Sequence, residues 1–581
     1  MGLKIVRSFL LASVTITLGT GAYAAPMLRL ASSTVGPVSV ASGTNGKTQT
    51  IEAYNAGDGS LSLSMTSSAP WVVPTVGTAR VCTTVNASSC FPLQFAFNTS
   101  SLAASTTPYT AVVTVTSPNT VDAPQTITVT VQVGGGVPSS VDIYVAPGAT
   151  RDVSFSTNST LTGAASTQDG GKWLSLALVG NGSFRFVLPY NIHIAPQAGN
   201  TSGGVYNGNL TISGSSIPTE NKTVPVTMRV TSQAIAQAST NQVTVRMAQG
   251  EPARTPQFFA PSVSLVNIGQ AGSSLVPGTP TVTGTGVSYG AGGMTFDTTG
   301  LAPGDYPGSI TLPSNAVNGT VTVPILFSVL AKGNPAIYYQ GVQDNATFVP
   351  GDSLAPGDVA VIKGDQLSFS TLTVGQAPPM STQVSDVSVT VNGEPAPIFY
   401  TLPFQICFQV PEDVAPGWAV VQLKRTDGTA SNLVSVKIAA RAPKIVPILG
   451  GPYGAIVNQD GTLPLPEGYV TGLYTHPAHV GDWLTIYCIG LGATNPAVDT
   501  GAPAPLVEPY ARLIDTPTVT FGTFSGALGV SATPLYSGLS GGSAGLYQLN
   551  VQIPPDTPPG TVWVSALFPD STSNKVAIEV Q

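Results

Sequence analysis

The sequence predicts a nearly all-β protein made of immunoglobulin-like β-sandwich domains in tandem. Charged residues make up only 8% of the 581 residues, whereas hydrophobic residues make up 42%. The 63 Gly and 50 Pro residues separate short runs in which apolar and polar residues alternate, as a half-buried strand requires. Disordered chains lack this apolar content, so many short strands joined by Gly/Pro turns are the better interpretation.

The first 24 residues have the features of a bacterial secretory signal peptide. Lys4 and Arg7 precede an apolar stretch at 9–18 that is too short to span a bilayer, and Ala22-Tyr23-Ala24 forms an A-x-A cleavage site. The alternative is an uncleaved anchor. We expect a mature chain that starts at Ala25, is secreted to the extracellular space or the cell surface, and has no membrane insertion after cleavage.

The strand patterns then divide the chain into five segments. The first three each contain a Tyr-led strand, at Tyr109, Tyr206 and Tyr306, followed by an alternating closing strand, and this period predicts an internal repeat. The Gly run at 134–136 predicts a hinge after the first segment. The predicted divisions are the signal peptide 1–24 and sandwich domains at 25–136, 137–235, 236–333, 334–443 and 444–581.

Motifs in the first three segments follow one pattern. Leu301-Ala-Pro-Gly-Asp-Tyr-Pro-Gly-Ser-Ile-Thr311 carries it most fully, and Trp71-Val-Val-Pro and Trp173-Leu-Ser-Leu add a Trp-led strand that the third segment replaces with Val287-Ser-Tyr289. This pattern resembles the BACON family of β-sandwich domains. The resemblance implies the sandwich fold and, from the family's name, carbohydrate binding, with extracellular polysaccharide as a partner. It supplies no binding motif for individual residues.

The C-terminal half contains a duplication. Gln405-Ile-Cys-Phe-Gln-Val-Pro411 parallels Gln548-Leu-Asn-Val-Gln-Ile-Pro554, and Ser431-Asn432 parallels Ser573-Asn574. The order of these motifs predicts two sandwiches of the same topology. Extra residues in the second unit, roughly 491–517, are rich in Gly, Ala and Pro and predict a surface loop. The alternation in each Gln-led strand predicts that its apolar residues are buried: Ile406, Phe408, Leu549 and Val551.

Further motifs mark residues 337–581. They are Asn345-Ala at the entry, Asn392-Gly with a following Pro-Ala, and Ala455-Ile-Val-Asn-Gln-Asp-Gly-Thr462. Together with the Gln405-Ile406 strand, and in their order along the chain, they resemble the Solibacter-type uncharacterised C-terminal domain family of secreted bacterial proteins. The sequence departs from the duplicated pattern at Cys407, where the second unit has Asn550. The resemblance implies secretion and fold, and it implies no reaction.

Candidate motifs for catalysis or metal binding are weak. Ser288 and Ser540 lie in G-x-S-x-G patterns, but in Gly/Ser-rich loops without the strand-to-helix turn of a nucleophile elbow. His476-Pro-Ala-His479 has Pro inside it and lacks a third ligand, and Asn458-Gln-Asp-Gly461 lacks the acids of a calcium loop and predicts a hairpin turn. We therefore expect no enzyme, no catalytic residue, no cofactor and no metal.

The charge of the chain and its aromatic residues limit the kinds of partner that it can bind. Cleavage after Ala24 leaves 19 Lys and Arg against 28 Asp and Glu, and this acidic, charge-poor chain argues against nucleic acid as a partner. One Trp per sandwich is more often core than binding surface. Trp418 follows a Pro-Gly turn and is the candidate ligand platform. The other Trp residues are Trp71, Trp173, Trp483 and Trp563.

The four cysteines fall into two kinds. Cys82 and Cys90 lie eight residues apart in a polar segment, and export predicts a disulfide between them, with two free thiols as the alternative. Cys407 and Cys488 lie within apolar strand patterns and are expected to be small buried residues.

The leading hypothesis from the sequence is a secreted, non-enzymatic multidomain protein that serves as an extracellular adhesion, scaffold or display array. Its partners are then cell-surface proteins or extracellular polysaccharide. The alternative is a carbohydrate-binding protein that acts through the BACON-like repeats. A third hypothesis, a hydrolase, requires an active site, and the sequence shows none.

Overall fold

The computed structural model confirms the predicted tandem β-sandwich fold. It contains 44 strands and two short 3-10 turns, at Pro218–Glu220 and Pro256–Phe258, and no α-helix among the described residues. None of these residues lies in a helix long and apolar enough to cross a membrane. The signal-peptide features at 1–24 lie outside the described residues. The structure describes residues 25–105, 108–118, 120–157, 159–179, 188–290, 292–448, 451–470, 472–524 and 529–581.

The first sandwich packs two four-stranded sheets face to face. One has the order β1-β3-β6-β5 and the other β2-β8-β7-β4, with β2 parallel to β8. Trp71, Phe95 and Ile127 lie in the core between them. The strands are β1 (Leu28–Leu30), β2 (Thr34–Val40), β3 (Gln49–Asn55), β4 (Ser64–Ser67), β5 (Val72–Val76), β6 (Cys90–Phe97), β7 (Tyr109–Thr116) and β8 (Gln125–Val133).

The second sandwich pairs a three-stranded sheet, β10-β13-β12, with a four-stranded sheet, β11-β14-β15-β9. Trp173 is 1% exposed at the centre of its core. The strands are β9 (Val141–Val145), β10 (Arg151–Thr157), β11 (Thr162–Thr167), β12 (Leu174–Leu178), β13 (Leu188–Ile194), β14 (Val205–Ser213) and β15 (Lys222–Val230).

The third sandwich has one four-stranded sheet, β17-β23-β22-β19, covered by the pairs β16-β18 and β20-β21. Phe296 and Phe327 fill its core. The strands are β16 (Ala236–Ala238), β17 (Val243–Ala248), β18 (Leu265–Asn267), β19 (Thr281–Thr283), β20 (Val287–Gly290), β21 (Gly293–Phe296), β22 (Gly304–Leu312) and β23 (Val321–Leu330).

Each of these three sandwiches contains a four-stranded sheet of the same topology. In each of these sheets, the edge strand that comes first in the chain pairs in parallel with the closing strand, as β2 with β8, β9 with β15 and β17 with β23. The repeated Tyr has the same function in all three, because its hydroxyl fixes the loop that leads into the Tyr's own strand, as a tyrosine corner does. The hydroxyls donate to upstream carbonyl oxygens, Tyr109 to Ala103 at 3.0 Å, Tyr206 to Gly199 at 3.4 Å and Tyr306 to Ala302 at 2.8 Å.

The fourth sandwich consists of the sheets β24-β25-β31-β30-β26 and β27-β28-β32-β33, with β29 also paired to β28. Ile406 and Phe408 are fully buried in its core, as predicted. The strands are β24 (Ala336–Asp344), β25 (Val359–Asp365), β26 (Thr373–Val374), β27 (Gln383–Val384), β28 (Val387–Val391), β29 (Glu394–Ala396), β30 (Ile398–Thr401), β31 (Gln405–Gln409), β32 (Gly417–Arg425) and β33 (Val434–Ile438).

The fifth sandwich repeats the central strand order of the fourth, with the sheets β34-β36-β42-β41-β38-β37 and β40-β39-β43-β44, and β35 also pairs with β36. Leu549 and Val551 are fully buried, as predicted. The strands are β34 (Lys444–Ile445), β35 (Ile456–Asn458), β36 (Trp483–Ile489), β37 (Thr494–Asn495), β38 (Arg512–Leu513), β39 (Thr518–Gly522), β40 (Val530–Ala532), β41 (Tyr536–Leu539), β42 (Tyr547–Gln552), β43 (Gly560–Leu567) and β44 (Val576–Val580).

The duplicated Ser-Asn pair holds the first strand of each unit. The Asn432 side chain accepts from the backbone N–H of Ile337 at 2.8 Å and donates to its carbonyl at 3.0 Å. Asn574 makes the same two bonds to Ile445, at 2.7 and 2.9 Å. The motif therefore has the same structural role in both units, where its Asn side chain hydrogen-bonds the backbone of the first strand.

The predicted surface loop at 491–517 is in part wrong. Strands β37 and β38 lie in this segment and extend the sheet beyond β41, and Leu513 is 7% exposed within the core. The physical reason is the open edge of β41, whose backbone groups need a partner, just as β26 covers β30 in the fourth sandwich.

The predicted hinge at 134–136 is also wrong. The backbone N–H of Gly134 donates to Val40 in the first sandwich at 2.7 Å, and that of Gly136 donates to the buried Glu220 carboxylate in the second at 2.8 Å. A Cβ at Gly136 would lie 1.8 Å from the carbonyl oxygen of Ser156. The glycines allow close approach of two backbones, and the linker is hydrogen-bonded to both sandwiches.

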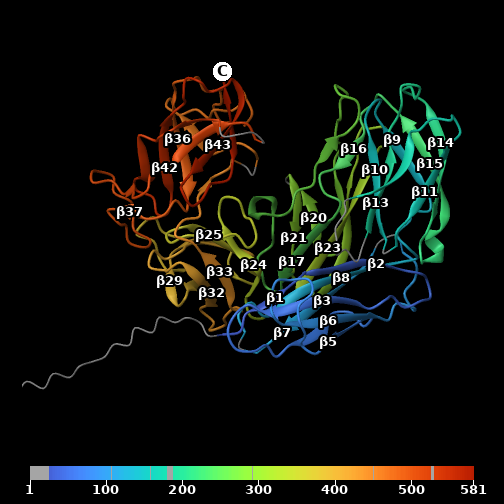
Figure 1. Cartoon of the computed structure of the whole chain (residues 1–581), viewed down its shortest axis with the longest axis horizontal. Helices are drawn as coiled ribbons and strands as arrows, with labels where there is room; N and C mark the ends of the chain where they lie inside the picture. Colours follow the sequence, from blue (N-terminus) through green and yellow to red (C-terminus); the bar gives the residue numbers. More distant parts are fainter. Residues whose placement is uncertain are drawn as a thin grey trace, which may run out of the picture.

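The sandwiches also contact one another beyond their linkers (Figure 1). Arg246 of the third pairs with Asp365 of the fourth at 2.9 Å, and Arg254 lies 4.2 Å over the Phe404 ring. The first sandwich, at the lower edge of Figure 1, contacts the fourth as well. Contacts therefore join the first four sandwiches in a closed cycle, which we call the ring.

We expect Val551→Asp to destabilise the fifth sandwich by about 3–5 kcal/mol, because an unpaired charge would be buried beside Leu484. In calorimetry, the transition of this sandwich should move to lower temperature or disappear. Gln552→Asp is the matched control, since the next residue on β42 is exposed. Equal melting of the two variants would contradict the assigned register.

Candidate functional site

The interface between the first and fourth sandwiches is built around a buried ion pair. Arg29 on β1 donates to the Asp122 carboxylate, and both side chains contact Ser435 on β33. Ser435 donates to Asp122 through its backbone N–H at 2.7 Å and its hydroxyl at 2.6 Å, and its hydroxyl oxygen accepts from Arg29 at 2.6 Å. Residues that are about 300 to 400 positions apart thus share one hydrogen-bond network.

This network is largely shielded from water. The side chains of Arg29 and Asp122 are 13% and 2% exposed, and burial lowers the pKa of Arg29 from its ordinary value. Met27, Val121 and Val420 form an apolar cluster beside the pair. Removal of one partner from such a buried pair costs about 3–5 kcal/mol, because the other charge stays unpaired.

Trp418, the candidate ligand platform, belongs to the same interface. It lies on β32 opposite Lys437 and is 56% exposed. The Arg29 guanidinium lies over its ring at 5.3 Å from the centroid, as in a cation–π contact. One face of the ring is therefore occupied by the chain itself, and a ligand on the other face stays a prediction.

Three of the other Trp residues lie closer to the cores of their sandwiches than Trp418 does. Trp71 and Trp173 are 8% and 1% exposed. Trp563 is half-buried, and the Phe524 ring covers it at 4.6 Å between centroids. None of these three offers an open flat face of the kind that a sugar ring stacks on.

Cys82 and Cys90 are joined by a disulfide in the structure, with their Cα atoms 5.0 Å apart. The loop between them is held by Glu52 on β3, whose carboxylate accepts from the backbone N–H groups and hydroxyls of Thr83 and Thr84 at 2.6–3.0 Å. Burial alone would raise the pKa of Glu52, but these hydrogen bonds lower it to about 2.

The remaining cysteines are free and buried, as expected from the sequence. Burial raises the pKa of Cys407 to about 12 and also raises that of Cys488. Both thiols therefore stay protonated at neutral pH, and neither is an activated nucleophile.

The weak catalytic and metal motifs have structural roles in the described chain. Ser540 lies in the turn between β41 and β42, where its hydroxyl donates to Gln548 at 2.9 Å, and Ser288 lies in the hairpin β20–β21. His476 bonds Asp460 at 3.0 Å, and this contact raises the pKa of His476. Among the described residues, no group of three His, Cys, Asp or Glu side chains could hold a metal ion.

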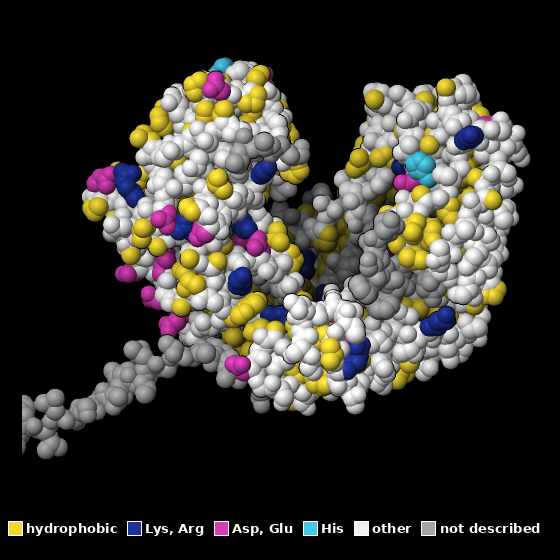
Figure 2. All heavy atoms as spheres, viewed as in Figure 1, with side chains coloured by type: hydrophobic (Ala, Val, Ile, Leu, Met, Phe, Trp, Pro, Cys, Tyr) yellow, Lys and Arg dark blue, Asp and Glu magenta, His cyan; other side chains and the backbone are white. Residues whose placement is uncertain are grey.

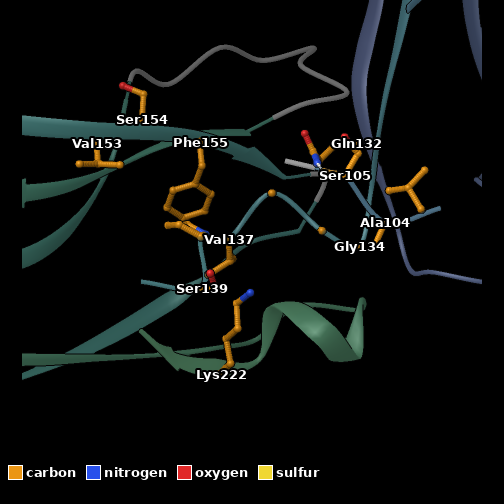
Figure 3. Close-up of a pocket in the computed structure, with 14 residues that line it drawn as sticks. Ala104, Ser105, Gln132, Gly134, Val137, Ser139, Val153, Ser154, Phe155 and Lys222 are labelled. Atoms are coloured by element: carbon orange, nitrogen blue, oxygen red, sulfur yellow. Dashed lines mark hydrogen bonds between the residues drawn. The ribbon is translucent and has the colours of Figure 1, made fainter. Parts of the chain in front are cut away.

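A cavity of about 400 Å³ lies where the first and second sandwiches meet (Figure 3). The Phe155 ring and Val137 form an apolar wall, and the Lys222 side chain enters from below with its ammonium group toward Ser139. Gln132 closes the side that belongs to the first sandwich. The fixed Gly run at 134–136 forms part of the rim, so the cavity keeps its shape.

The chemistry of this cavity suits a polar ligand with a partly apolar face. Burial lowers the pKa of Lys222, and the nearby Glu220 carboxylate opposes that change. No described residue forms an ion pair with Lys222, so its ammonium group can donate to a ligand. One aromatic ring beside several donors and acceptors is an arrangement that recognises hydroxyl-rich molecules.

The sequence pattern predicted neither the network of Arg29, Asp122 and Ser435 nor the cavity beside Lys222. Arg29, Asp122 and Ser435 are isolated residues without a spacing motif, and Lys222 looks like an ordinary strand residue. The only signal was the positive charge of Arg29 and Lys222 in a chain with few charges, and it does not identify a partner.

No protein-family model matches the chain, and no curated protein matches it. Among solved structures, it is similar to SGBP-B of the Bacteroides ovatus mixed-linkage glucan utilization locus, in complex with a mixed-linkage heptasaccharide, with 12% identity, 60% of this chain and 70% of that chain covered, and a TM-score of 0.20.

Two other solved structures are similar at the same low level. An endo-fucoidan hydrolase of glycoside hydrolase family 107 has 12% identity and a TM-score of 0.18, over 51% of this chain and 43% of the hydrolase. Extracellular cadherin domains 1–4 of protocadherin gamma B7 have 9% identity and a TM-score of 0.14, over 65% of this chain and 92% of that one. The chain is a multidomain β-sandwich protein, and similarity this low assigns it no activity.

We expect Glu52→Gln to destabilise the first sandwich by about 2–3 kcal/mol at pH 7 and far less at pH 2.5. The folded pKa of Glu52 lies below its ordinary 4.5, so its contribution to stability is present above pH 4.5 and is lost as the pH falls toward 2. Calorimetry at both pH values measures the difference, with exposed Asp58→Asn as the control. A loss of stability independent of pH would contradict a charged Glu52.

Proposed function

We propose that the protein is exported and acts outside the cell, or at its surface, as a non-enzymatic scaffold of the adhesion or display type. The observation that carries this proposal is the closing of the first sandwich onto the fourth through Arg29, Asp122 and Ser435. A ring of four sandwiches holds its exposed loops at fixed distances from one another.

Rigid spacing has a physical benefit for binding. A partner that contacts several sandwiches at once does not have to order flexible linkers, so less conformational entropy is lost on association. The hydrogen bonds of Gly134 and Gly136 and the Arg246–Asp365 pair support the same rigidity. Loops at sandwich ends are the surfaces that such a scaffold presents.

The test measures retention of fluorescently labelled mature protein, residues 25–581, on intact cells of the producing bacterium and on its extracellular material. We expect retention of the wild type and roughly tenfold weaker retention of Arg29→Ala, because the unpaired Asp122 favours an open ring. Arg229→Ala is the matched control, since Arg229 pairs with Asp142 on an exposed surface. No retention of the wild type, or equal retention of Arg29→Ala, would contradict the proposal.

A second candidate function, carbohydrate binding through the first three sandwiches, is favoured by the cavity between the first and second. Phe155 supplies an apolar face, and Lys222, Gln132 and Ser139 supply polar groups around it. A pull-down with a panel of polysaccharides separates this function from a scaffold role. Binding that Lys222→Gln reduces, while Lys172→Gln on an exposed turn leaves it unchanged, supports the carbohydrate function; absence of binding across the panel argues against it.

A further inference from the structure

A second cavity, of about 520 Å³, lies between the fourth and fifth sandwiches. Its floor consists of Val359 and Cys407 from the fourth sandwich and Ile489 from the fifth, which are 8%, 2% and 3% exposed. These residues form a small apolar cluster of their own, separate from the cores of the two sandwiches. The volume is within the range of small-molecule sites in proteins.

Most of the rim is apolar as well, and the polar groups of the lining come from Asn345, Tyr400 and Ser543. Phe399, Val446 and Leu546 are half-buried and pack against the floor. Among the residues that the structure describes, no charged side chain lines the cavity. A water molecule needs two to four polar partners to be held in place, and these walls offer few of them. Water inside is therefore weakly held, and an apolar molecule displaces it favourably.

Hydrogen bonds donated by backbone N–H groups join the fourth and fifth sandwiches across the interface. The N–H of Gly501 in the fifth sandwich donates to the Gln409 side chain at 2.7 Å, and its carbonyl accepts from Met380 at 2.9 Å. The N–H of Glu412 donates to the Thr500 hydroxyl at 2.9 Å. Since these bonds fix the two sandwiches, the cavity is formed before any ligand arrives, and binding loses little conformational entropy.

The charge of the surroundings selects against anions. From residue 334 onward, the chain has 18 Asp and Glu against 8 Lys and Arg, whereas residues 25–333 have 10 against 11. Figure 2 shows the acidic side chains gathered on the fourth and fifth sandwiches. An anionic amphiphile is repelled by this field, while an uncharged molecule is not.

We propose that this cavity is a binding site for an uncharged, largely apolar small molecule. The occupant lies against Val359, Cys407 and Ile489 and is covered on one side by the Phe399 ring. The site is independent of the scaffold role, so a failure of one leaves the other unaffected.

The test is a fluorescence titration of the mature protein with N-phenyl-1-naphthylamine, an uncharged apolar probe. We expect saturable binding at one site, and binding of the anionic probe 8-anilinonaphthalene-1-sulfonate that is weaker by about tenfold or more. Ala544→Phe fills the cavity and should weaken binding of the uncharged probe by about tenfold or more. Ala165→Phe, on exposed strand β11, is the matched control and should bind as the wild type does.

Calorimetry establishes that each variant is folded. If Ala544→Phe fails to fold, Ser543→Trp at the half-exposed mouth replaces it, because Ser543 contributes only backbone bonds to the loop. The proposal is overturned if the uncharged probe does not bind, if the filled variant binds it as well as the wild type, or if the anionic probe binds equally well.

Discussion

The carboxylate of Asp122 is buried where the first and fourth sandwiches meet, and a buried carboxylate has to be paired, hydrogen-bonded or protonated. Arg29 supplies the opposite charge, and Ser435 supplies two further donors from a strand at the far end of the ring. Neither sandwich completes this network alone. The contact of the first sandwich with the fourth, which closes the ring of four sandwiches, is centred on this network.

The same principle recurs elsewhere in this charge-poor chain. Its few buried carboxylates accept hydrogen bonds from loops and linkers that would otherwise be loose. Glu52 holds the disulfide loop, and Glu220 binds the linker at Gly136 together with the Thr157 hydroxyl. Asp358, fully buried, accepts from the start of β25, and its burial raises its pKa. Buried carboxylates such as those of Glu52 and Glu220 therefore hold separate segments of this protein together through hydrogen bonds.

Sequence analysis predicted what depends on neighbouring residues. The alternation of apolar and polar residues predicted the tandem sandwiches and the buried faces of the Gln-led strands, because alternation is a property of a single strand. The order of the motifs predicted the duplication, because it is a property of strands that follow one another in the chain. It failed where the partner is distant. The Gly run at 134–136 was interpreted as a hinge because Glu220 lies more than 80 residues away. The segment at 491–517 was interpreted as a loop because the open edge of β41 is invisible in a linear pattern, and the Arg29–Ser435 contact joins residues 406 apart.

Small-angle X-ray scattering of the mature chain tests the ring most directly. The account predicts one compact scattering profile for the wild type, unchanged by Arg229→Ala, and a larger radius of gyration for Arg29→Ala, because the unpaired Asp122 is relieved when the first sandwich leaves the fourth. A wild-type profile that only an extended, flexible chain of sandwiches can fit, or an Arg29→Ala profile identical to that of the wild type, would contradict it.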